Sequence, residues 1–320
     1  MINFLCPNTN LPTGGIKTLY RATEILNNHG IDSCIYHIQN TNYNIDWISH
    51  TVKLRDNDVI DPYKDFMVVP EIYVAEYGSK FLYSKIKYAI FVQNQFYIHA
   101  CLNSNCNQLK EIYEGADLII VTSESLKDDI QFYFPGIDNS KFTTLIPSFV
   151  RSYKNVPKTK TITYMPKHRL PKHVEFLIFL LKDYFLPNDW RLVKLENLSE
   201  SKVSTILSES VMHLSFSDLE GLGMVNVEAA MHENIVIGYT GWGGKEFFAE
   251  PLFYEIEPND FKKFISRILE TINKFETNTL YDNTLKENIL YIRTRYSQKV
   301  ESDLLLKFSK KVNDIMKTII

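Results

Sequence analysis

The stretch from Val211 to Glu246 (VMHLSFSDLEGLGMVNVEAAMHENIVIGYTGWGGKE) constrains the fold more than any other part of the chain. It begins with a short apolar run, Val211–Phe216, that has the character of a buried strand. A loop with two glycines follows over Ser217–Gly223, and the apolar residues of Met224–His232 suit a buried helix. Ile235–Tyr239 is a second apolar strand, and a glycine-rich turn closes the stretch. Strand, glycine loop, helix and strand in this order are typical of a parallel α/β unit.

Two carboxylates frame the expected helix. Glu220 lies in the loop before it and Glu228 lies within it, about one turn below the helix mouth at roughly 1.5 Å per residue. The N-terminus of a helix offers unpaired N–H groups and the positive end of the helix dipole, which together suit a phosphate. Two hydrogen-bond acceptor side chains beside such an anion-binding position indicate a ligand like a nucleotide sugar. A solvated loop glutamate and a helix-surface glutamate are the alternative, and the flanking strands and glycines favour the binding interpretation.

Composition limits the class of protein. The length of 320 residues favours two domains, and 45% hydrophobic with 23% charged residues is ordinary for a globular protein. A net charge of −3 gives no basic field for nucleic acid. The sequence shows no 18-residue apolar run and no basic n-region, so we expect neither a transmembrane helix nor a signal peptide, and a cytoplasmic location. The four cysteines and eight histidines form no C-x-x-C or H-E-x-x-H, so we expect reduced thiols and no zinc site.

The first half of the chain predicts a second α/β unit of the same kind. Ile2–Cys6 reads as a strand, Gly14-Gly15 ends a loop, Ile16 to Leu26 has helical spacing, and Ser33–Ile38 is the next strand. The glycines lack the G-x-G-x-x-G spacing, so no dinucleotide fingerprint is present. The Gly14-Gly15 pair is either a tight turn or a place where the backbone approaches a ligand.

Further strands are expected at Phe66–Val69, Tyr88–Gln93, Gly115–Thr122 and Phe142–Ile146, with helices over Val74–Tyr83 and after Ser123. Polar residues from Gln93 and Asn94 onward follow one of these strands, at the position where open α/β sheets bind ligands. Loop residues without a ligand are the equally weighted alternative. Asp56-Asn57-Asp58 reads as a solvated turn rather than a metal site.

The second half repeats the alternation after a polar linker at Lys154–Lys160. The expected elements are strands at Thr161–Met165 and Trp190–Lys194, and helices at Phe176–Phe185, Ser199–Ser208 and through Asp260–Ile320. The loop between the first strand and helix carries Lys167, Arg169 and Lys172, which would neutralise a diphosphate. A solvated basic loop is the alternative. Lysines on the last helix favour a solvated face over a contact with an anionic membrane.

These features together resemble a GT-B glycosyltransferase, specifically the retaining glycosyltransferase family four. The family's signature is two glutamates separated by seven residues in the setting E-G-x-G, which stands here as Glu220-Gly221-Leu222-Gly223 followed by Glu228. Gly243-Gly244-Lys245-Glu246 stands near the family's glycine turn, and Gly14-Gly15 matches its N-terminal loop.

The resemblance implies an α/β fold of two Rossmann-like domains facing each other across a cleft. Residues 1–152 would form the acceptor-side domain and residues 153–300 the nucleotide-sugar-binding domain. Residues 301–320 would form a helix that packs back on the N-terminal domain.

The resemblance also implies roles for individual residues. Glu220 would bind hydroxyls of the donor sugar and Glu228 the ribose of the nucleotide. The family usually holds the diphosphate with Gly-Arg and a lysine five residues after the arginine. Here Pro166-Lys167 stands in place of Gly-Arg, and Lys172 stands in place of the lysine. Either Lys167 or Arg169 would therefore assist Lys172. The acceptor would meet the N-terminal domain at Gln93 and Asn94. The donor site would be completed by Gly15, Gly221, Gly223, Met224, Gly243 and Gly244.

The implied activity is transfer of a sugar from a nucleotide-diphosphate sugar to a glycan or lipid-linked acceptor, with retention of configuration and without a bound metal or other cofactor. Bacterial surface polysaccharide synthesis, with peripheral contact at the inner face of the membrane, is the implied setting. Two alternatives stay open: a non-catalytic sugar-nucleotide-binding GT-B protein or partner subunit, and a sugar-nucleotide epimerase on the same fold.

Overall fold

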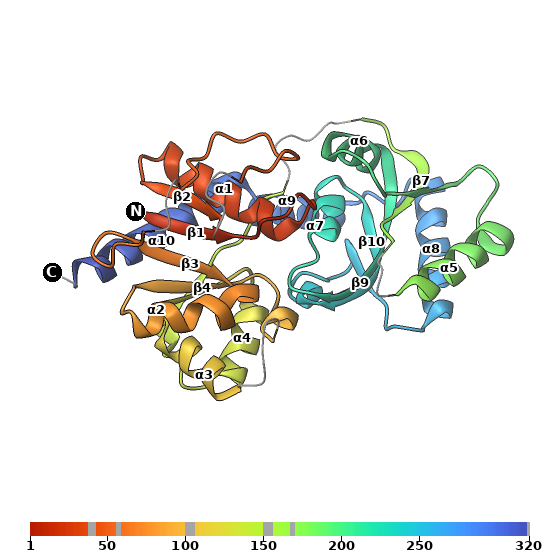
Figure 1. Cartoon of the computed structure of the whole chain (residues 1–320). Helices are drawn as coiled ribbons and strands as arrows, with labels where there is room; N and C mark the ends of the chain where they lie inside the picture. Colours follow the sequence, from red (N-terminus) through yellow and green to blue (C-terminus); the bar gives the residue numbers. More distant parts are fainter. Residues whose placement is uncertain (38–42, 56–58, 100–105, 150–155, 167–169, 319–320) are drawn as a thin grey trace. The chain divides into compact units, whose positions relative to one another are not determined.

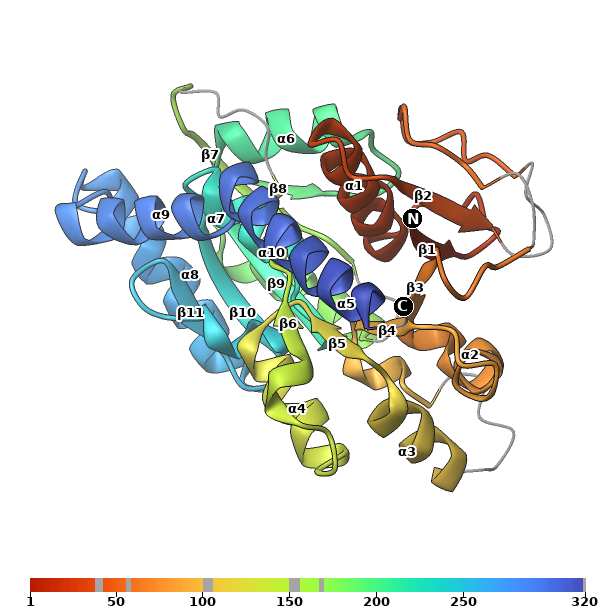
Figure 2. The same ribbon diagram turned by 90° about the vertical axis from the view of Figure 1, so that its left-hand side faces the viewer.

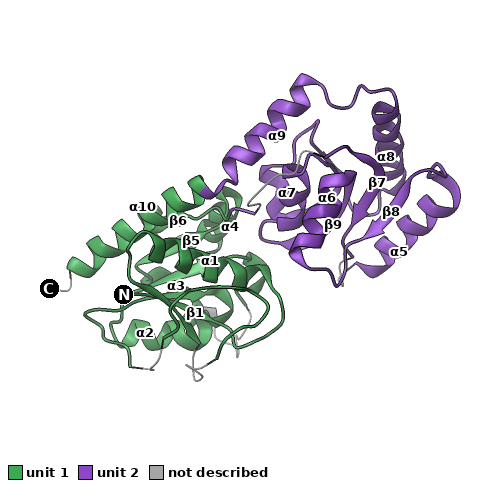
Figure 3. Cartoon of the chain, turned by 90° about the horizontal axis from the view of Figure 1, so that it is seen from above, with its two compact units in different colours: residues 1–147, 299–320 green, residues 148–298 purple. Residues whose placement is uncertain are grey.

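The computed structural model describes residues 1–37, 43–55, 59–99, 106–149, 156–166 and 170–318. The chain divides into two compact units, shown in green and purple in Figure 3. Unit 1 comprises Met1–Pro147 and Lys299–Ile320, and unit 2 comprises Ser148–Gln298. The division therefore falls after residues 147 and 298, where the sequence analysis placed it after residues 152 and 300.

Unit 1 is built on a sheet of six parallel strands in the order β2-β1-β3-β4-β5-β6. The strands are β1 (Ile2–Cys6), β2 (Ser33–His37), β3 (Phe66–Pro70), β4 (Tyr88–Val92), β5 (Leu118–Val121) and β6 (Phe142–Thr144). The first strand pairs with β2 on one side and β3 on the other, so the direction of winding reverses between β1 and β3. This reversal is a topological switch point, the place where open α/β sheets bind ligands.

Helices cover both faces of this sheet because side chains along each strand alternate between two cores (Figure 1). Phe4 points into one core, with α1 and α10, whereas its neighbour Leu5 points into the other, with the helices from η2 to α4. The helical elements of unit 1 are α1 (Gly14–Asn28), η1 (Glu71–Tyr73), η2 (Val74–Gly78), α2 (Ser79–Tyr83), η3 (Gln95–Tyr97), α3 (Cys106–Gly115), α4 (Glu124–Tyr133), η4 (Asn139–Lys141) and α10 (Gln298–Lys317).

The last helix, α10, completes the core of unit 1 (Figure 2). Its Leu305 and Phe308 are buried with strand residues, and the ring centroids of Phe308 and Phe66 lie 6.4 Å apart. A buried ion pair joins it to α1, where Arg21 Nε lies 2.8 Å from Glu301 Oε2. Burial of such apolar side chains is the main term that holds a helix on a sheet.

Unit 2 contains five parallel strands in the order β11-β10-β9-β7-β8. They are β7 (Thr159–Tyr164), β8 (Arg191–Lys194), β9 (Ser210–Glu220), β10 (Ile235–Trp242) and β11 (Phe253–Glu255). The helical elements are α5 (Pro171–Leu180), η5 (Leu181–Phe185), α6 (Glu200–Glu209), α7 (Met224–Met231), η6 (Gly243–Glu246), α8 (Phe261–Glu276) and α9 (Asn283–Arg295). Strand β7 has β8 on one side and β9 on the other, so the switch point of this sheet lies between β7 and β9.

Two segments differ from the sequence-based predictions near the expected site. Ser217–Glu220 is not a loop but the end of β9, because it stays paired with β10. Gly14-Gly15 is not a loop but the first turn of α1, because the hydroxyl of Thr13 accepts the Ile16 N–H at 3.3 Å and starts the helix there.

Other differences lie away from the site. Gly115 ends helix α3 instead of beginning a strand, and neither α3 nor the short strand β11 was predicted. Thr159 and Lys160 belong to β7 rather than to the linker. The Asp56-Asn57-Asp58 turn lies outside the described residues.

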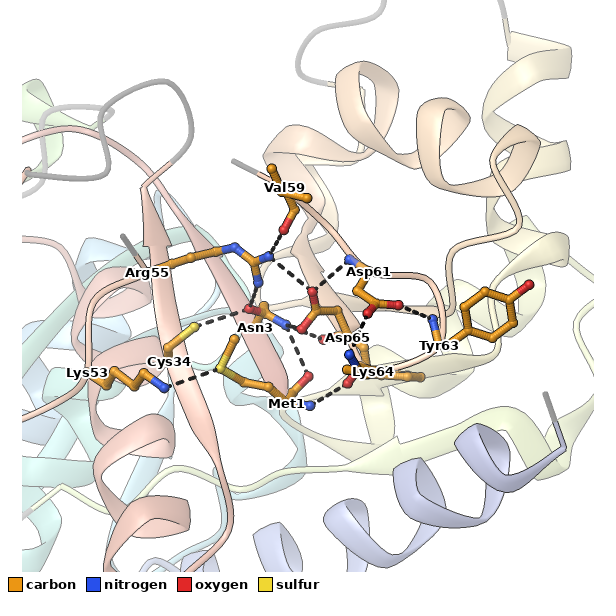
Figure 4. Close-up of polar contacts among 11 residues, drawn as sticks. Met1, Asn3, Cys34, Lys53, Arg55, Val59, Asp61, Tyr63, Lys64 and Asp65 are labelled. Carbon is orange, nitrogen blue, oxygen red and sulfur yellow. Dashed lines mark hydrogen bonds and ion pairs between the residues drawn. The ribbon is translucent and has the colours of Figure 1, made fainter. Parts of the chain in front are cut away.

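A buried ionic network fixes the amino end of β3 (Figure 4). Asp65 Oδ2 lies 3.0 Å from Arg55 Nη2 and accepts the Asp61 N–H at 2.9 Å, while its Oδ1 accepts from the Asn3 amide at 3.2 Å. Arg55 also donates to the side chain of Asn3 and to the carbonyl of Val59. Burial alone would raise the pKa of Asp65, but the hydrogen bonds from Arg55 and from the amide of Asp61 hold it below its usual range.

We expect Asp65→Ala to lower the free energy of unfolding of unit 1 by about 3–5 kcal/mol, because it leaves the Arg55 guanidinium buried without its partner. Chemical denaturation of the wild type and of Asp65→Ala measures the difference in the free energy of unfolding. Lys64→Ala is the matched control, since Lys64 pairs with Asp61 at the exposed surface, and its midpoint should equal that of the wild type. Equal midpoints for Asp65→Ala and the control would contradict this account.

Candidate functional site

The described donor residues, apart from Gly15 of unit 1, lie at the carboxyl edge of the sheet in unit 2. Strand β7 ends at Tyr164 and leads toward the basic segment, whereas its neighbour β9 leads into the E-G-x-G segment. Strand β9 continues beyond Leu214, its last residue paired with β7, and stays paired with β10 as far as Glu220 opposite Trp242. Both expected segments therefore leave the switch point of this sheet, where ligands bind in open α/β folds.

Glu220 is the last residue of β9, and three residues separate it from Met224, the first residue of α7. Its side chain is half-buried. Gly223 is the N-cap of α7, with φ 75° and ψ 56°, a left-handed conformation that glycine adopts without steric cost. Glycine has no side chain to cap the helix, and the Asn226 N–H donates to the Gly223 carbonyl at 3.0 Å. The N-terminus of α7 is therefore open to an anion at the N–H groups before Asn226.

A second glycine segment packs directly against the first. A β-carbon on Gly243 would overlap the carbonyl oxygen of Gly221, and one on Gly241 would lie 2.8 Å from the β-carbon of Ser217. Gly241 also has φ 66°, which disfavours any other residue. The structure thus brings together Glu220, Gly221 and Gly243, which the sequence analysis assigned to one site.

Helix α7 is buried and fixed at both ends. Near its start, Asn226 Nδ2 donates to Ser217 Oγ at 3.1 Å and ties the helix to β9. At its end, His232 places Nδ1 at 3.0 Å from Ser208 Oγ and Nε2 at 3.2 Å from Ser204 Oγ. Burial, followed by the positive charges of nearby Lys158 and Arg293, lowers the pKa of His232 to about 4. His232 is therefore neutral at pH 7.

The remaining expected donor residues occupy three different settings. Met224 and Glu228 lie in the first and second turns of α7, both half-buried, and Gly244 is buried in η6 beside Phe248. The roles implied for them stay predictions. Lys167 and Arg169 lie outside the described residues.

Lys172 lies in the first turn of α5 rather than in a loop, because Pro171 begins the helix at its first position. Its side chain is exposed. A cation at a helix N-terminus opposes the helix dipole, and that turn holds no acidic residue to balance it. A bound anion at this position would offset the repulsion between the Lys172 charge and the positive end of the helix dipole.

Two side chains beside the glycine turn were not predicted. Trp242 has φ 75°, which is rare for an aromatic residue, and its side chain is 47% exposed. Lys245 Nζ lies 4.3 Å from the centroid of its ring, a cation–π contact. Within the same turn, Glu246 pairs with Arg295 of α9 at 2.8 Å. The only sequence signal was an aromatic residue immediately before two glycines.

The expected acceptor-side residues lie at the carboxyl edge of the sheet in unit 1. Gln93 Nε2 donates to the carbonyl of Gly15 at 3.4 Å, so these two predicted residues are neighbours. Asn94 is the N-cap of η3, and its side chain accepts the Phe96 N–H at 3.0 Å. Glu71 was not predicted from the sequence, and its carboxylate accepts the backbone N–H groups of both Gln93 and Asn94. Its only signal was a carboxylate directly after a buried strand.

Two features are absent from the part of the chain that the structure describes. Within it, no group of three or more His, Cys, Asp and Glu side chains could hold a metal ion. Within the same residues, no helix is long and apolar enough to cross a bilayer.

Known proteins resemble this chain in sequence and in fold. No protein-family model matches the sequence. The "Alpha-1,6-glucosyltransferase" of Actinobacillus pleuropneumoniae serotype 7 (strain AP76) is 25% identical over 225 residues, which is 66% of this chain and 64% of that protein. The match therefore spans less than two thirds of the curated relative.

Solved structures match nearly the whole chain. The sucrose-phosphate synthase (tll1590) of Thermosynechococcus elongatus has a TM-score of 0.66 at 11% identity and covers 99% of both chains. An E. coli structure described as trehalose-6-phosphate bound with UDP-2-fluoro glucose has a TM-score of 0.65 at 9% identity, over 97% of this chain and 98% of that one.

We expect Gly243→Ala to lower the free energy of unfolding of unit 2 by about 1–3 kcal/mol, because the new methyl group overlaps backbone that cannot rotate away. Gly244→Ala is the matched control, since its β-carbon would lie 3.3 Å from the Phe248 ring, a side chain that can shift. Thermal or urea denaturation measures both. A smaller effect at position 243 than at position 244 would contradict the backbone contact.

We expect unit 2 to lose stability as the pH falls from about 6.5 to about 4. The folded-state pKa of His232, about 4, lies below its unfolded value of 6.5, so the unfolded chain binds more protons in this window. Proton binding therefore stabilises the unfolded chain relative to the folded one. The loss attributable to this residue is at most about 3 kcal/mol.

Denaturation at several pH values measures the slope. His232→Gln should flatten it, whereas His29→Gln, a change at an exposed position in unit 1, should leave it as in the wild type. An unchanged slope in His232→Gln would refute the assignment.

Proposed function

The chain is a GT-B protein related to the glycosyltransferases, and on that premise we propose that it transfers a sugar from a nucleotide-diphosphate sugar to a hydroxyl of a glycan or lipid-linked acceptor. One observation carries the proposal. The E-G-x-G segment ends β9 at a switch point and packs against the glycine turn of Gly243, so that a carboxylate, a helix N-terminus and a glycine-lined backbone meet at one place.

UDP-glucose is the proposed donor. The E. coli neighbour is described with UDP-2-fluoro glucose, and the curated relative is named for transfer of glucose. By the roles that the family resemblance implies, Glu220 hydrogen-bonds the sugar hydroxyls and Glu228 the ribose. Lys172 lies on a helix turn that an anion would stabilise, which supports its assignment to the diphosphate.

The proposed reaction breaks the bond between the anomeric carbon and the diphosphate oxygen and forms a bond to the acceptor oxygen on the same face of the sugar. Negative charge that develops on the leaving diphosphate is stabilised by Lys172 and by the first-turn N–H groups of α7. The acceptor's proton passes to an oxygen of the departing phosphate. Retention of configuration and independence from metal are parts of this proposal, as is a role in surface polysaccharide synthesis in the cytoplasm.

A second candidate is a sugar-nucleotide-binding GT-B protein without transfer activity. The observation that favours it is the Pro166-Lys167 pair in place of the family's Gly-Arg, because lysine is a point charge and lacks the bidentate geometry of arginine. Binding without turnover would support this candidate. Conversion of the donor without any acceptor would instead indicate an epimerase.

We expect Lys172→Gln to weaken UDP binding about tenfold, through loss of a charge-assisted contact with the diphosphate. Lys202→Gln is the matched control, since Lys202 is also an exposed lysine in the first turn of a helix of unit 2. Calorimetric titration with UDP, with and without EDTA, measures both. Equal affinities in the two variants would remove Lys172 from the site, and loss of wild-type binding in EDTA would overturn metal independence.

We expect Glu220→Ala to keep UDP affinity but to lose most turnover of UDP-glucose, because Glu220 contacts the sugar and UDP has none. Release of UDP from UDP-glucose in the presence of glucose oligosaccharides measures turnover. Turnover near that of the wild type would remove Glu220 from the site. A wild-type protein that binds UDP yet never turns over would favour the second candidate.

A further inference from the structure

Glu71 is a buried carboxylate at the carboxyl end of β3 that holds two consecutive backbone amides. Its Oε2 accepts the Gln93 N–H at 3.2 Å and its Oε1 accepts the Asn94 N–H at 3.1 Å. The side chain is 4% exposed. Each carboxylate oxygen therefore fixes one amide of the segment that leaves the end of β4.

The segment held by Glu71 makes further contacts at the same edge of the sheet. The side chain of Gln93 reaches back to the carbonyl of Gly15, which begins α1 just after β1. Gln95 Nε2 donates to Asp129 of α4 at 3.1 Å. Two side chains, Glu71 and Gln93, thus connect the carboxyl ends of β3 and β4 to α1, the helix that follows β1. Strands β1 and β3 form the switch point of this sheet.

Burial of this charge is costly to the fold. Burial raises the pKa of Glu71 to about 7, although the hydrogen bonds from the amides of Gln93 and Asn94 act to lower it. The charge of Glu71 also adds to burial in raising the pKa of Tyr113, whose buried hydroxyl has no hydrogen-bond partner among the described residues. A neutral amide side chain cannot replace the carboxylate, because it has one acceptor oxygen for two N–H groups.

We infer that Glu71 is a positioning residue for the acceptor: it fixes the backbone of Gln93 and Asn94 so that their side chains keep the geometry that receives the acceptor's hydroxyls. The inference rests on the proposed function, in which these two residues form the acceptor side. It assigns to Glu71 no contact with either substrate. Its effect is expected on acceptor binding and not on donor binding, because the donor's nucleotide is assigned to unit 2.

The test compares Glu71→Gln with Asp117→Asn. Asp117 is the matched control because its carboxylate accepts the Tyr88 N–H at 3.0 Å and so holds the opposite end of the same strand, β4. Both substitutions replace a carboxylate by an isosteric amide. Glu71 accepts two backbone N–H groups, whereas Asp117 accepts one and pairs with Lys87 through its other oxygen. Only the first of them affects the segment from Gln93 to Asn94.

Two measurements are made on the full chain. In hydrogen exchange, Glu71→Gln should accelerate exchange at Gln93 and Asn94 about tenfold, whereas Asp117→Asn should leave it unchanged. In transfer from UDP-glucose to isomaltotriose or maltotriose, Glu71→Gln should raise the KM for the acceptor about tenfold, with kcat and the Kd for UDP changed less than about twofold. If Glu71→Gln fails to fold, Glu71→Asp replaces it, with both effects smaller but in the same direction.

The outcomes separate the inference from the proposed function. Unchanged exchange at Gln93 and Asn94, or faster exchange with an unchanged acceptor KM, overturns the inference while wild-type transfer upholds the function. Loss of UDP binding in Glu71→Gln would show a general structural role and also overturn it. A wild-type protein that transfers glucose to neither oligosaccharide refutes the proposed acceptor class and the inference with it, whatever the exchange rates.

Discussion

Parallel strand pairing is the constraint on which the rest of this structure depends. In both sheets every described strand runs parallel to its neighbours, so all the carboxyl ends of one sheet lie at one edge. The order of strands then sets where on that edge a ligand can enter, because connections diverge at the switch point. In unit 2 that point lies between β7 and β9, and in unit 1 it lies between β1 and β3. The residues assigned to donor and acceptor follow strands at or beside these points, which is why segments far apart in the sequence converge.

The sequence allowed most strands to be predicted because buried parallel strands are continuous apolar runs. Strand β1 agrees at both ends, and the GT-B fold is confirmed by the solved structures. The end of β9 was missed because Ser217–Glu220 lacks such a run, and its pairing with β10 is a contact distant in sequence. Helix α3 was missed because its polar sequence hides a short apolar stripe of Leu109, Ile112 and Tyr113.

The candidate site was predictable to the extent that its residues form a motif. Glu220, Gly221 and Gly243 were assigned together, and the structure places the second glycine segment against the first. Glu71 was not predicted, because its partners lie 22 and 23 residues further along the chain and beyond another strand. No local pattern distinguishes it from any other glutamate after a strand. Such residues become visible only when the hydrogen-bond partners of each buried charge are known.

The position of α10 in the chain has a consequence for biosynthesis. Unit 2 is inserted within unit 1, since residues 148–298 separate the sheet of unit 1 from the helix that completes its core. A ribosome therefore delivers the strands of unit 1 first and their last covering helix after all of unit 2. During that interval Phe66, whose ring contacts Phe308 of the last helix, and Phe4, which belongs to the same core, lack that cover. The domain that begins first is completed last, and its nascent sheet is the part of the chain that a chaperone has most reason to bind.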